Sequence, residues 1–483
     1  MKNKLVVFIR EYKVIIFLFF LSFFIRFIFI FEDMPFITHP DEPTVVNSTL
    51  NLKYDLNPKH FDWPTFYYYI NYGFFSILYF IERIMSRIGH PYPEIVQLEN
   101  FYLLSRIITC VFGSLSIVFL FQFVLNLSKR KDLAVFSAVI MSIIPFHITR
   151  SAQALTDVPM LFFVICSLYY LSKNLEDFSW RNIYLASLFV GLATSTKYNG
   201  YMFALSVILF VLVIKKFSFT DFLNYIYCGI FATVGFLIGT PYALLDYKTF
   251  LIDDSPKGAL WQFKNVGSLD LKNQLIAFFN NLTSSVLSDF AFIPWIATLV
   301  FIFFYFFKGD YKLKDKYSRF ILILILQFLF IIWSVSGVKI QRSHYFIGLY
   351  TLVPVFSTLI LSKNFRVLFG SVLVTSILSL YLLSYNMLNN SRIEFYDRVD
   401  FKNNIKNYNI LYSDSELRDI LRKLGTKSDE FDPNLMDFNS KFYSHILTSK
   451  DLCPDVNFCS YRLIDRIVNK DKGNDLLIYE IIK

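Results

Sequence analysis

Residues 14–31, which read VIIFLFFLSFFIRFIFIF, decide the fold class, because Arg26 is the only charged residue among them. A helix of about 20 apolar residues crosses the hydrocarbon core of a bilayer. Four basic residues precede this run, and positive charge favours the cytoplasmic side. We therefore predict a transmembrane helix with a cytoplasmic N-terminus, in which Arg26 extends outward to the lipid headgroups. No small-residue cleavage site follows the run, so we expect the helix to be retained. The basic residues are Lys2, Lys4, Arg10 and Lys13.

The composition extends this interpretation to most of the chain. Of the 483 residues, 55% are hydrophobic and 18% are charged, and the mean hydropathy is +0.46. Soluble domains contain about 45–50% apolar and about 25% charged residues. Because the apolar residues fall in many long runs, they must face lipid rather than fill one globular core. The basic residues behind the net charge of +9 cluster in short loops between these runs, which is typical of cytoplasmic loops and argues against nucleic-acid binding.

We predict an α-helical polytopic membrane protein with about eleven transmembrane helices. The aromatic, amphipathic residues 66–88 are expected to form one or two interfacial helices in the first outer loop. The predicted spans are 14–31, 101–127, 133–148, 158–171, 183–194, 201–214, 222–238, a run ending at Lys308, 320–335, 346–361 and 367–388.

The tail has a different character, with alternating charge and short apolar runs. We divide the chain into a transmembrane domain, 1–388, and a small soluble α/β domain, 389–483, which an odd number of spans places outside the cytoplasm. The tail is predicted to contain strands at 409–412 and 476–482 and a helix at 415–424. Cys453 and Cys459 could form a disulfide in an oxidising compartment, and their pairing stays open.

The sharpest candidate for chemistry is the sequence His39-Pro-Asp41-Glu42, directly after the first span. Transfer of a glycosyl group to a hydroxyl needs a base that accepts the hydroxyl proton. A carboxylate that is partly desolvated at the membrane boundary suits that role. The plain alternative is an ordinary acidic loop.

A second candidate is the outer loop 339–345, which contains Lys339, Arg342, His344 and Tyr345. Cations at the outer end of a helix are unusual, and a guanidinium group matches the oxygens of a phosphate. Preorganised cations would stabilise the charge that develops on a phosphate leaving group. Contact with lipid headgroups is the alternative.

Two further outer positions carry charge. Arg150 and Asp157 lie between the third and fourth predicted spans, and Lys197 lies in a tight turn between the fifth and sixth. Arg150 and Asp157 could line a site, or they could form a simple salt bridge. Lys197 is a further candidate for phosphate binding.

Weaker signals come from the aromatic loop 51–64, which contains His60 and could stack on a sugar or anchor at the interface. Asn47, Asn281 and Asn390 begin Asn-x-Ser/Thr sequons on the predicted outer face. The sequence has no Gly-rich phosphate loop and no zinc-ligand spacing.

Together these segments resemble the multispanning C-type glycosyltransferases that use polyprenyl-phosphate sugars, and they are most similar to the protein O-mannosyltransferase family and its prokaryotic relatives. The resemblance covers residues 1–388. It is carried by His39-Pro-Asp-Glu42, the Asn-Pro…Phe…Trp-Pro…Tyr pattern at 57–69, Arg150 with Ala-Leu-Thr-Asp-Val-Pro at 154–159, Gly-Leu-Ala-Thr-Ser-Thr-Lys-Tyr-Asn-Gly at 191–200, and Arg-x-His-Tyr at 342–345.

The resemblance implies a hexosyltransferase that transfers a mannose-like sugar with inversion on the extracytoplasmic side of the cell membrane. Asp41 would be the catalytic base, supported by Glu42, and Arg342 would hold the leaving phosphate. Arg150 and Lys197 would be secondary donor contacts. The partners would be membrane lipid, a polyprenyl-phosphate-linked sugar and a glycan, lipid or protein acceptor, with no nucleic acid.

His39 and His60 could help to bind a divalent ion, as in oligosaccharyl relatives. The mannosyl branch implies no metal and no other cofactor. The tail lacks the trefoil-like repeat of the eukaryotic protein mannosyltransferases, so the acceptor is left open. Trp63-Pro-Thr stands where the aminoarabinose transferases have lysine before a proline pair, which argues against that branch.

Two other classes of function remain. A transporter or flippase of a lipid-linked sugar would place ionisable residues near the bilayer midplane, in spans related by an inverted repeat. A non-catalytic membrane scaffold would leave the charged outer loops without a role.

Overall fold

The computed structural model describes residues 2–31, 39, 41–87, 98–285, 292–307, 315–361 and 365–388, and five strands between 410 and 481. The chain divides into two compact units. The first comprises residues 1–30, 45–92 and 103–382, and the second comprises 31–44, 93–102 and 383–483. We describe each unit by itself.

Each predicted apolar run lies in one or more helices. Inside a bilayer there is no water to bind backbone N–H and C=O groups, and a helix pairs these groups with each other through hydrogen bonds. The first five runs correspond to α1 (Lys2–Phe27) with η1 (Ile28–Phe31), α4 (Leu98–Ser128), α5 (Lys131–Ile143) with α6 (Pro145–Ser151), α7 (Asp157–Lys173) and α8 (Trp180–Thr196). The other six correspond to η3 (Tyr198–Phe203) with α9 (Ala204–Leu209) and η4 (Phe210–Lys216), to α10 (Phe222–Gly239), and to α16 (Phe292–Phe307), α17 (Lys316–Ser336), α18 (Leu349–Leu361) and α19 (Phe365–Leu388).

Among the residues described, five helices are long and apolar enough to cross a membrane. They are Lys13–Phe31, Glu99–Ser128, Tyr198–Lys216, Phe219–Gly239 and Lys316–Ser336. The bent pair α5 and α6 raises this number to six if it is one span. The protein is therefore a helical, multi-pass membrane protein, while the full set of about eleven spans stays a prediction.

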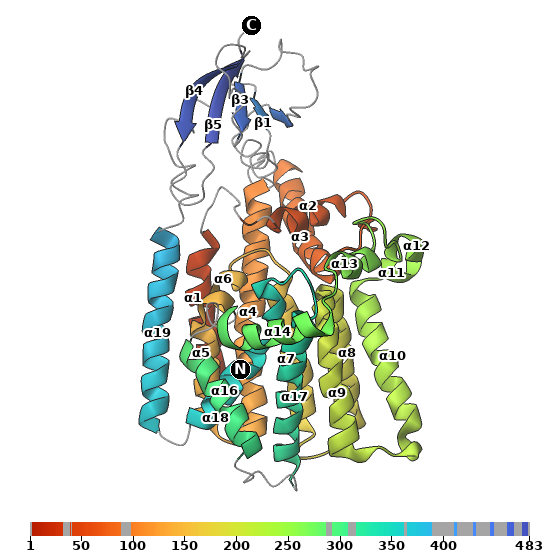
Figure 1. Ribbon diagram of the computed structural model, residues 1–483, viewed down its shortest axis with the longest axis vertical. Helices are drawn as coiled ribbons and strands as arrows, with labels where there is room; N and C mark the ends of the chain where they lie inside the picture. The colour runs from red at the N-terminus through yellow and green to blue at the C-terminus, as the bar shows by residue number, and fades with distance from the viewer. Residues whose placement is uncertain are drawn as a thin grey trace. The chain divides into compact units, whose positions relative to one another are not determined.

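Helices α7, α8 and α10 pack side by side (Figure 1). Glycines allow α8 and α10 to approach closely. A Cβ atom on Gly191 would lie 2.0 Å from the Ala232 carbonyl oxygen, and one on Gly235 would lie 2.3 Å from the Leu188 carbonyl oxygen. Small residues at such contacts are typical of helix pairs in membranes.

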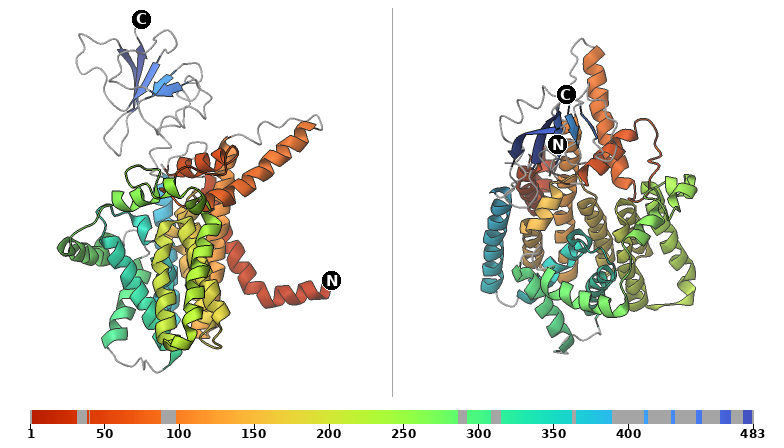
Figure 2. Two further views of the ribbon diagram at one scale, coloured as in Figure 1. Left: turned by 90° about the vertical axis from the view of Figure 1, so that its right-hand side faces the viewer. Right: turned by 45° about the horizontal axis from the view of Figure 1, so that its top comes forward.

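The two long segments that are predicted to lie on the outer side fold into helices, most of them short. The first contains α2 (Glu42–Asn51) and α3 (Phe66–Arg87), which covers the predicted interfacial stretch. The second segment follows α10, which is itself preceded by η5 (Phe219–Asp221). It contains α11 (Tyr242–Leu245), α12 (Tyr247–Phe250), α13 (Ala259–Asn265), α14 (Leu271–Asn280) and η6 (Asn281–Ser285). Figure 2 shows α11, α12 and α13 in green, gathered at one end of the helix bundle near the start of α3.

Hydrogen bonds join these two outer segments to each other. The Phe61 N–H donates to the Lys257 carbonyl oxygen at 2.6 Å, and the Asn57 side chain donates to Asp246 at 2.8 Å. The Thr65 hydroxyl donates to the Gly239 carbonyl oxygen at 2.8 Å. Two segments that are far apart in sequence, 57–65 and 239–257, are therefore held together by hydrogen bonds.

One sequence-based expectation is wrong. Arg26 does not extend to the lipid headgroups, because its side chain is completely buried between α1, α4 and α6. Its guanidinium donates hydrogen bonds to the Ser22 carbonyl oxygen of its own helix and to His147 and Ser151 of α6, and these replace hydrogen bonds to water.

The second unit contains a five-stranded sheet in the tail, with strand order β2-β1-β3-β5-β4. Strands β1 and β2 and strands β1 and β3 are parallel, while β3 and β5 and β4 and β5 are antiparallel. Strands β1 and β5 lie where the sequence predicts them, whereas the predicted helix 415–424, Cys453 and Cys459 lie outside the described residues. The strands are β1 (Ile410–Tyr412), β2 (Ser428–Glu430), β3 (His445–Thr448), β4 (Tyr461–Ile467) and β5 (Leu476–Ile481).

The close approach of α8 and α10 gives a first prediction. Gly191→Ala and Gly235→Ala should each destabilise the protein by about 1–3 kcal/mol, since the new methyl group meets backbone atoms. Gly229→Ala in α10 is the matched control, because nothing lies within 4 Å of the added Cβ. Thermal unfolding in detergent measures the three variants, and equal behaviour of all three would contradict the packing described.

Candidate active site

The acidic loop leads into α2. The Asp41 N–H donates to Nδ1 of His39 at 3.2 Å, and the Glu42 N–H donates to the His39 carbonyl oxygen at 3.3 Å. His39 thus satisfies N–H groups at the start of the helix, as a capping residue does. Asp41 is partly exposed at this helix end, and Glu42 is fully buried.

The centre of the candidate site in the first unit is an ion pair. Nζ of Lys197 lies 2.7 Å from Oδ1 of Asp157, and the Asp157 side chain is 5% exposed. Asp157 is the first residue of α7, where the helix dipole favours a carboxylate. Lys197 ends α8 in an extended conformation, and Gly200 brings the following turn back onto the α8 backbone, where a Cβ would lie 2.5 Å from the carbonyl carbon of Ala193.

Two further side chains from the predicted set, His344 and Arg150, lie close enough to act on Asp157, and Arg342 acts on His344. Burial raises the pKa of Asp157, but the charge of Lys197, followed by His344 and Arg150, outweighs it and lowers that pKa to about 2. Burial first, and then Lys197, Arg150 and Arg342, lower the pKa of His344 to about 3 against the opposing effect of Asp157. The site therefore holds an ionised Asp157 and a neutral His344 at neutral pH.

These five groups carry an excess of positive charge. Lys197, Arg150 and Arg342 contribute three positive charges, Asp157 contributes one negative charge, and neutral His344 contributes none. The balance of +3 and −1 leaves +2. A region of this kind binds anions, and a phosphate is the group whose oxygens a guanidinium fork fits best.

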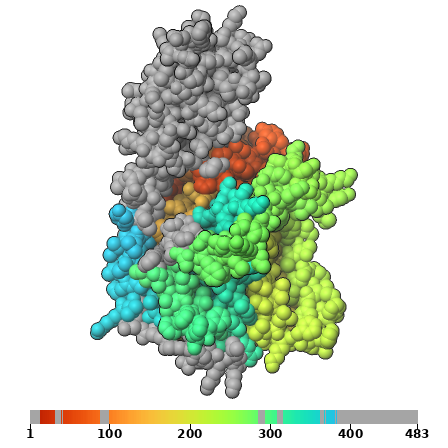
Figure 3. Space-filling view, in the orientation of Figure 1, coloured from red at the N-terminus to blue at the C-terminus, as the bar shows by residue number. Residues whose placement is uncertain are grey.

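The loop that carries Arg342 and His344 is held by the second outer segment. The buried amide of Asn281 donates to the Ser336 hydroxyl at 2.9 Å and to the Gln341 side chain at 2.8 Å. The Lys339 and Ile340 N–H groups both donate to the Val266 carbonyl oxygen. In the space-filling view this loop, in teal, lies against the green second segment (Figure 3). Asn281 is therefore a structural residue in this fold, despite its sequon.

The members of the 339–345 loop have different surroundings. Lys339 and Arg342 are exposed, whereas His344 is largely buried. The ring of Tyr345 packs edge-on against His344, with 4.7 Å between the centroids. The guanidinium carbon of Arg150 lies 5.0 Å above the Phe146 ring, which fixes its direction.

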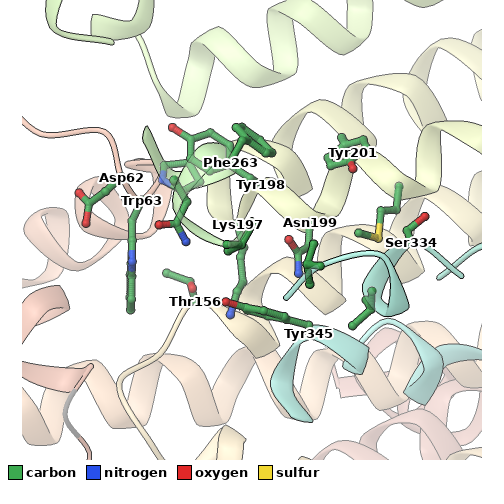
Figure 4. A pocket seen from close by; sticks show the side chains of 16 residues that line it. Asp62, Trp63, Thr156, Lys197, Tyr198, Asn199, Tyr201, Phe263, Ser334 and Tyr345 are labelled. Atoms are coloured by element: carbon green, nitrogen blue, oxygen red, sulfur yellow. The ribbon is translucent and has the colours of Figure 1, made fainter. Parts of the chain in front are cut away.

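A pocket opens beside Lys197 (Figure 4). It is built from the 62–64 loop, the turn after α8, α13 and the end of α17. Its walls combine aromatic rings with a few carboxylate, amide and hydroxyl groups, which is the chemistry that recognises sugars by stacking and hydrogen bonding. The aromatic lining residues are Trp63, Tyr198, Tyr201, Phe263 and Tyr345, and the polar ones include Asp62, Thr156, Asn199, Gln262 and Ser334.

His60 contacts one of the residues that line this pocket. Its Nε2 lies 3.0 Å from the Ser48 hydroxyl of α2, and its Nδ1 lies 2.8 Å from Asp62, which lines the pocket. Within the described ranges, no three His, Cys, Asp or Glu side chains gather closely enough to hold a metal ion.

The structure thus brings together Arg150, Asp157, Lys197, Arg342 and His344, with Tyr345 in contact with His344. Sequence reasoning does not predict that Asp157 pairs with Lys197, nor that Thr156, Tyr198, Gln262 and Phe263 line the pocket. For Thr156 and Tyr198, the sequence offered one signal of a place in the site. They are the chain neighbours of the candidate residues Asp157 and Lys197.

A family model matches part of the chain. Residues 91–252 match the family model described as dolichyl-phosphate-mannose-protein mannosyltransferase, PMT. This region contains Arg150, Asp157 and Lys197. The middle third of the chain is therefore similar to the PMT family.

A curated relative and two solved structures extend the comparison. The chain is 24% identical over 169 residues to dolichyl-phosphate-mannose–protein mannosyltransferase 1 of Saccharomyces cerevisiae, which is 33% of this chain and 20% of that protein. The match thus spans about a fifth of the relative's length. ArnT from Cupriavidus metallidurans bound to undecaprenyl phosphate has a TM-score of 0.62 at 12% identity, covering 97% of this chain and 98% of that chain. Its apo state gives 0.59 at 12% identity, with 99% and 98% covered. These structures share the fold.

The lowered pKa of His344 predicts a pH dependence of stability for this protein. Between about pH 6.5 and the native pKa of about 3, unfolded His344 binds a proton that the native residue excludes, so stability must fall as pH falls through this range. His344→Asn should remove that part of the pH dependence. Asp157→Asn should instead alter stability below about pH 4, where unfolded Asp157 becomes protonated. Thermal unfolding between pH 3 and 8 tests both, and a His344→Asn profile identical in slope to wild type would contradict the burial of a neutral imidazole.

Proposed function

We propose that this protein transfers a mannose-like hexose from a polyprenyl-phosphate donor to an acceptor hydroxyl on the extracytoplasmic side of the membrane, with inversion at the anomeric carbon. The observation that carries the proposal is the excess of two positive charges among Lys197, Asp157, Arg150, His344 and Arg342, next to an aromatic pocket. The family match over residues 91–252 supports the same donor class.

The charge balance suits the departure of a lipid phosphate. The donor is a phosphodiester with one negative charge, and cleavage of the bond between the anomeric carbon and the phosphate oxygen produces a phosphate monoester. A phosphate monoester carries about −1.5 to −2 at neutral pH. Two excess positive charges therefore interact more strongly with the leaving group than with the bound donor. Such differential stabilisation lowers the barrier rather than only tightening binding.

The reaction also needs one base, which accepts the proton that the acceptor hydroxyl loses. The acceptor oxygen forms a bond to the anomeric carbon as the bond to the phosphate oxygen breaks, and the acceptor proton moves to the base. We assign this proton to Asp41, which is partly exposed at the start of α2, and we assign Glu42 a supporting role. A carboxylate can accept the proton as the acceptor oxygen becomes acidic in the transition state.

We assign the donor phosphate to Arg342, Arg150 and Lys197, with Lys339, His344 and Tyr345 at the edge of the same region. The aromatic pocket beside Lys197 suits the sugar, because rings such as Trp63 and Phe263 offer stacking surfaces. The proposal includes eleven spans, a cytoplasmic N-terminus and an extracytoplasmic tail in the cell membrane. The acceptor is a glycan, lipid or protein hydroxyl.

The experiment follows the label of a radiolabelled donor in membranes that contain wild type or Asp41→Asn at equal protein level. Polyprenyl-phosphate mannose and polyprenyl-phosphate glucose are supplied in turn. We expect wild type to release label from the lipid, and Asp41→Asn to reduce the rate by about 10²-fold or more, in line with loss of a general base.

The other outcomes are also decisive. Equal rates in both proteins would remove Asp41 as the base while keeping the transferase. A wild type that releases no label from either donor but moves the lipid between leaflets would replace the transferase with the flippase alternative.

A further inference from the structure

The buried cation Arg26 lies outside the site described so far. Its guanidinium donates to the Ser22 carbonyl oxygen at 2.9 Å, to Nδ1 of His147 at 2.7 Å and to the Ser151 hydroxyl at 3.3 Å. In the part of the chain that the structure describes, no carboxylate forms an ion pair with it. Arg26 is completely buried, so it cannot itself reach a substrate.

A buried arginine without a carboxylate partner lowers the stability of the folded protein. A buried charge costs several kcal/mol in a protein interior and is rare within transmembrane helices. An apolar side chain of similar volume would join α1 to α6 as well, or better. The presence of arginine therefore points to a requirement for the geometry that its hydrogen bonds impose.

Those hydrogen bonds fix one face of α6. Helix α6 is bent by 66° from α5 at the break around Ile144, so α5 alone does not set its direction. His147 and Ser151 are four residues apart and share a face. Arg26 contacts both of them, and thereby fixes the position and rotation of a helix that has only seven residues.

A third helix, α4, packs closely against the contact between Arg26 and Ser151. Gly113 of α4 faces the cluster, and a Cβ atom there would lie 2.5 Å from the Ser151 hydroxyl oxygen and 3.2 Å from Nε of Arg26. Any other residue would displace one of these groups. The cluster therefore depends on a glycine on α4, an arginine on α1 and two polar residues on α6.

The same short helix carries a member of the candidate site. Arg150 lies between His147 and Ser151 in sequence, and its charge acts on Asp157 and His344. A rotation of α6 would move Arg150 relative to the Lys197–Asp157 pair. Arg26 is thus linked to the phosphate region through a single rigid turn of helix.

We propose that Arg26 is a positioning residue, which acts through His147 and Ser151 to hold Arg150 in place for the lipid phosphate. This proposal rests on the phosphate-binding part of the proposed function. It assigns a role to a buried intramembrane cation without any transport step.

A double-mutant cycle tests the proposal on the full-length protein. The proteins are wild type, Arg26→Met, Arg150→Met and the double variant, and the readout is the Kd for polyprenyl phosphate in detergent. We expect each single variant to weaken binding by about tenfold, and Arg26→Met to add less than about twofold once Arg150 is replaced, because residues that act through one another are not additive. Independent, multiplicative effects would overturn the proposal.

Thermal unfolding of the same proteins separates positioning from a purely structural role. We expect the Tm of Arg26→Met to equal or exceed that of wild type while its affinity for polyprenyl phosphate falls, since removing a buried charge relieves desolvation. A loss of affinity that follows a loss of Tm would overturn the proposal. Because the readout is binding, a wild type that binds the lipid phosphate without turnover contradicts the transferase and still allows the cycle to be read.

Gly113→Ala provides a second, independent perturbation of the cluster. It should weaken binding of polyprenyl phosphate in the same direction as Arg26→Met, because the methyl group displaces Ser151 or Arg26. Gly229→Ala in α10 is the matched control, since the space around it is open. Equal binding by these two glycine variants would count against a role for the cluster.

Discussion

The ion pair between Lys197 and Asp157 is the interaction on which the rest of the candidate site depends. Its carboxylate is almost entirely buried, and a buried pair is tolerated only when its geometry is good and its surroundings compensate for lost hydration. The turn that returns at Gly200 and the start of α7 provide that geometry. The two outer segments, joined at Phe61 and Lys257, build the adjoining pocket above it.

The pair does not neutralise its surroundings, and this imbalance gives the site its chemistry. Arg150 and Arg342 add charge that Asp157 cannot offset, while burial keeps His344 neutral. A neutral imidazole can offer a hydrogen bond without adding repulsion among the cations. In the proposed function, the site would therefore suit an anion whose charge grows during reaction. This is the requirement of a phosphate leaving group.

Much of the membrane architecture could be predicted from sequence, because apolar runs at helical length have few structural alternatives. The runs around 14–31 and 320–335 lie in helices, as predicted. Arg150, Lys197 and Arg342 were named as candidates from their predicted outer positions, and their roles stay predictions. Pairing across the fold could not be predicted, since Asp157 and Lys197 are forty residues apart on different helices. The burial of Arg26 was also missed, because its acceptors His147 and Ser151 lie on a bent helix far along the chain. Asn281 was interpreted from a three-residue motif, which carries no information on burial.

The most direct test of the charge imbalance is the Kd for polyprenyl phosphate in wild type, Asp157→Asn and Arg342→Gln, measured at one salt concentration. Replacing Asp157 with Asn raises the excess from +2 to +3, while the Asn side-chain oxygen can still accept the hydrogen bond from Nζ of Lys197 that holds the site together, so binding should become tighter. Replacing the exposed Arg342 lowers the excess to +1, so binding should become weaker. A shift of about tenfold is expected for the buried Asp157, and a smaller shift in the opposite direction for the exposed Arg342. Weaker binding in both variants, or no change in either, would contradict a cationic phosphate site centred on Lys197.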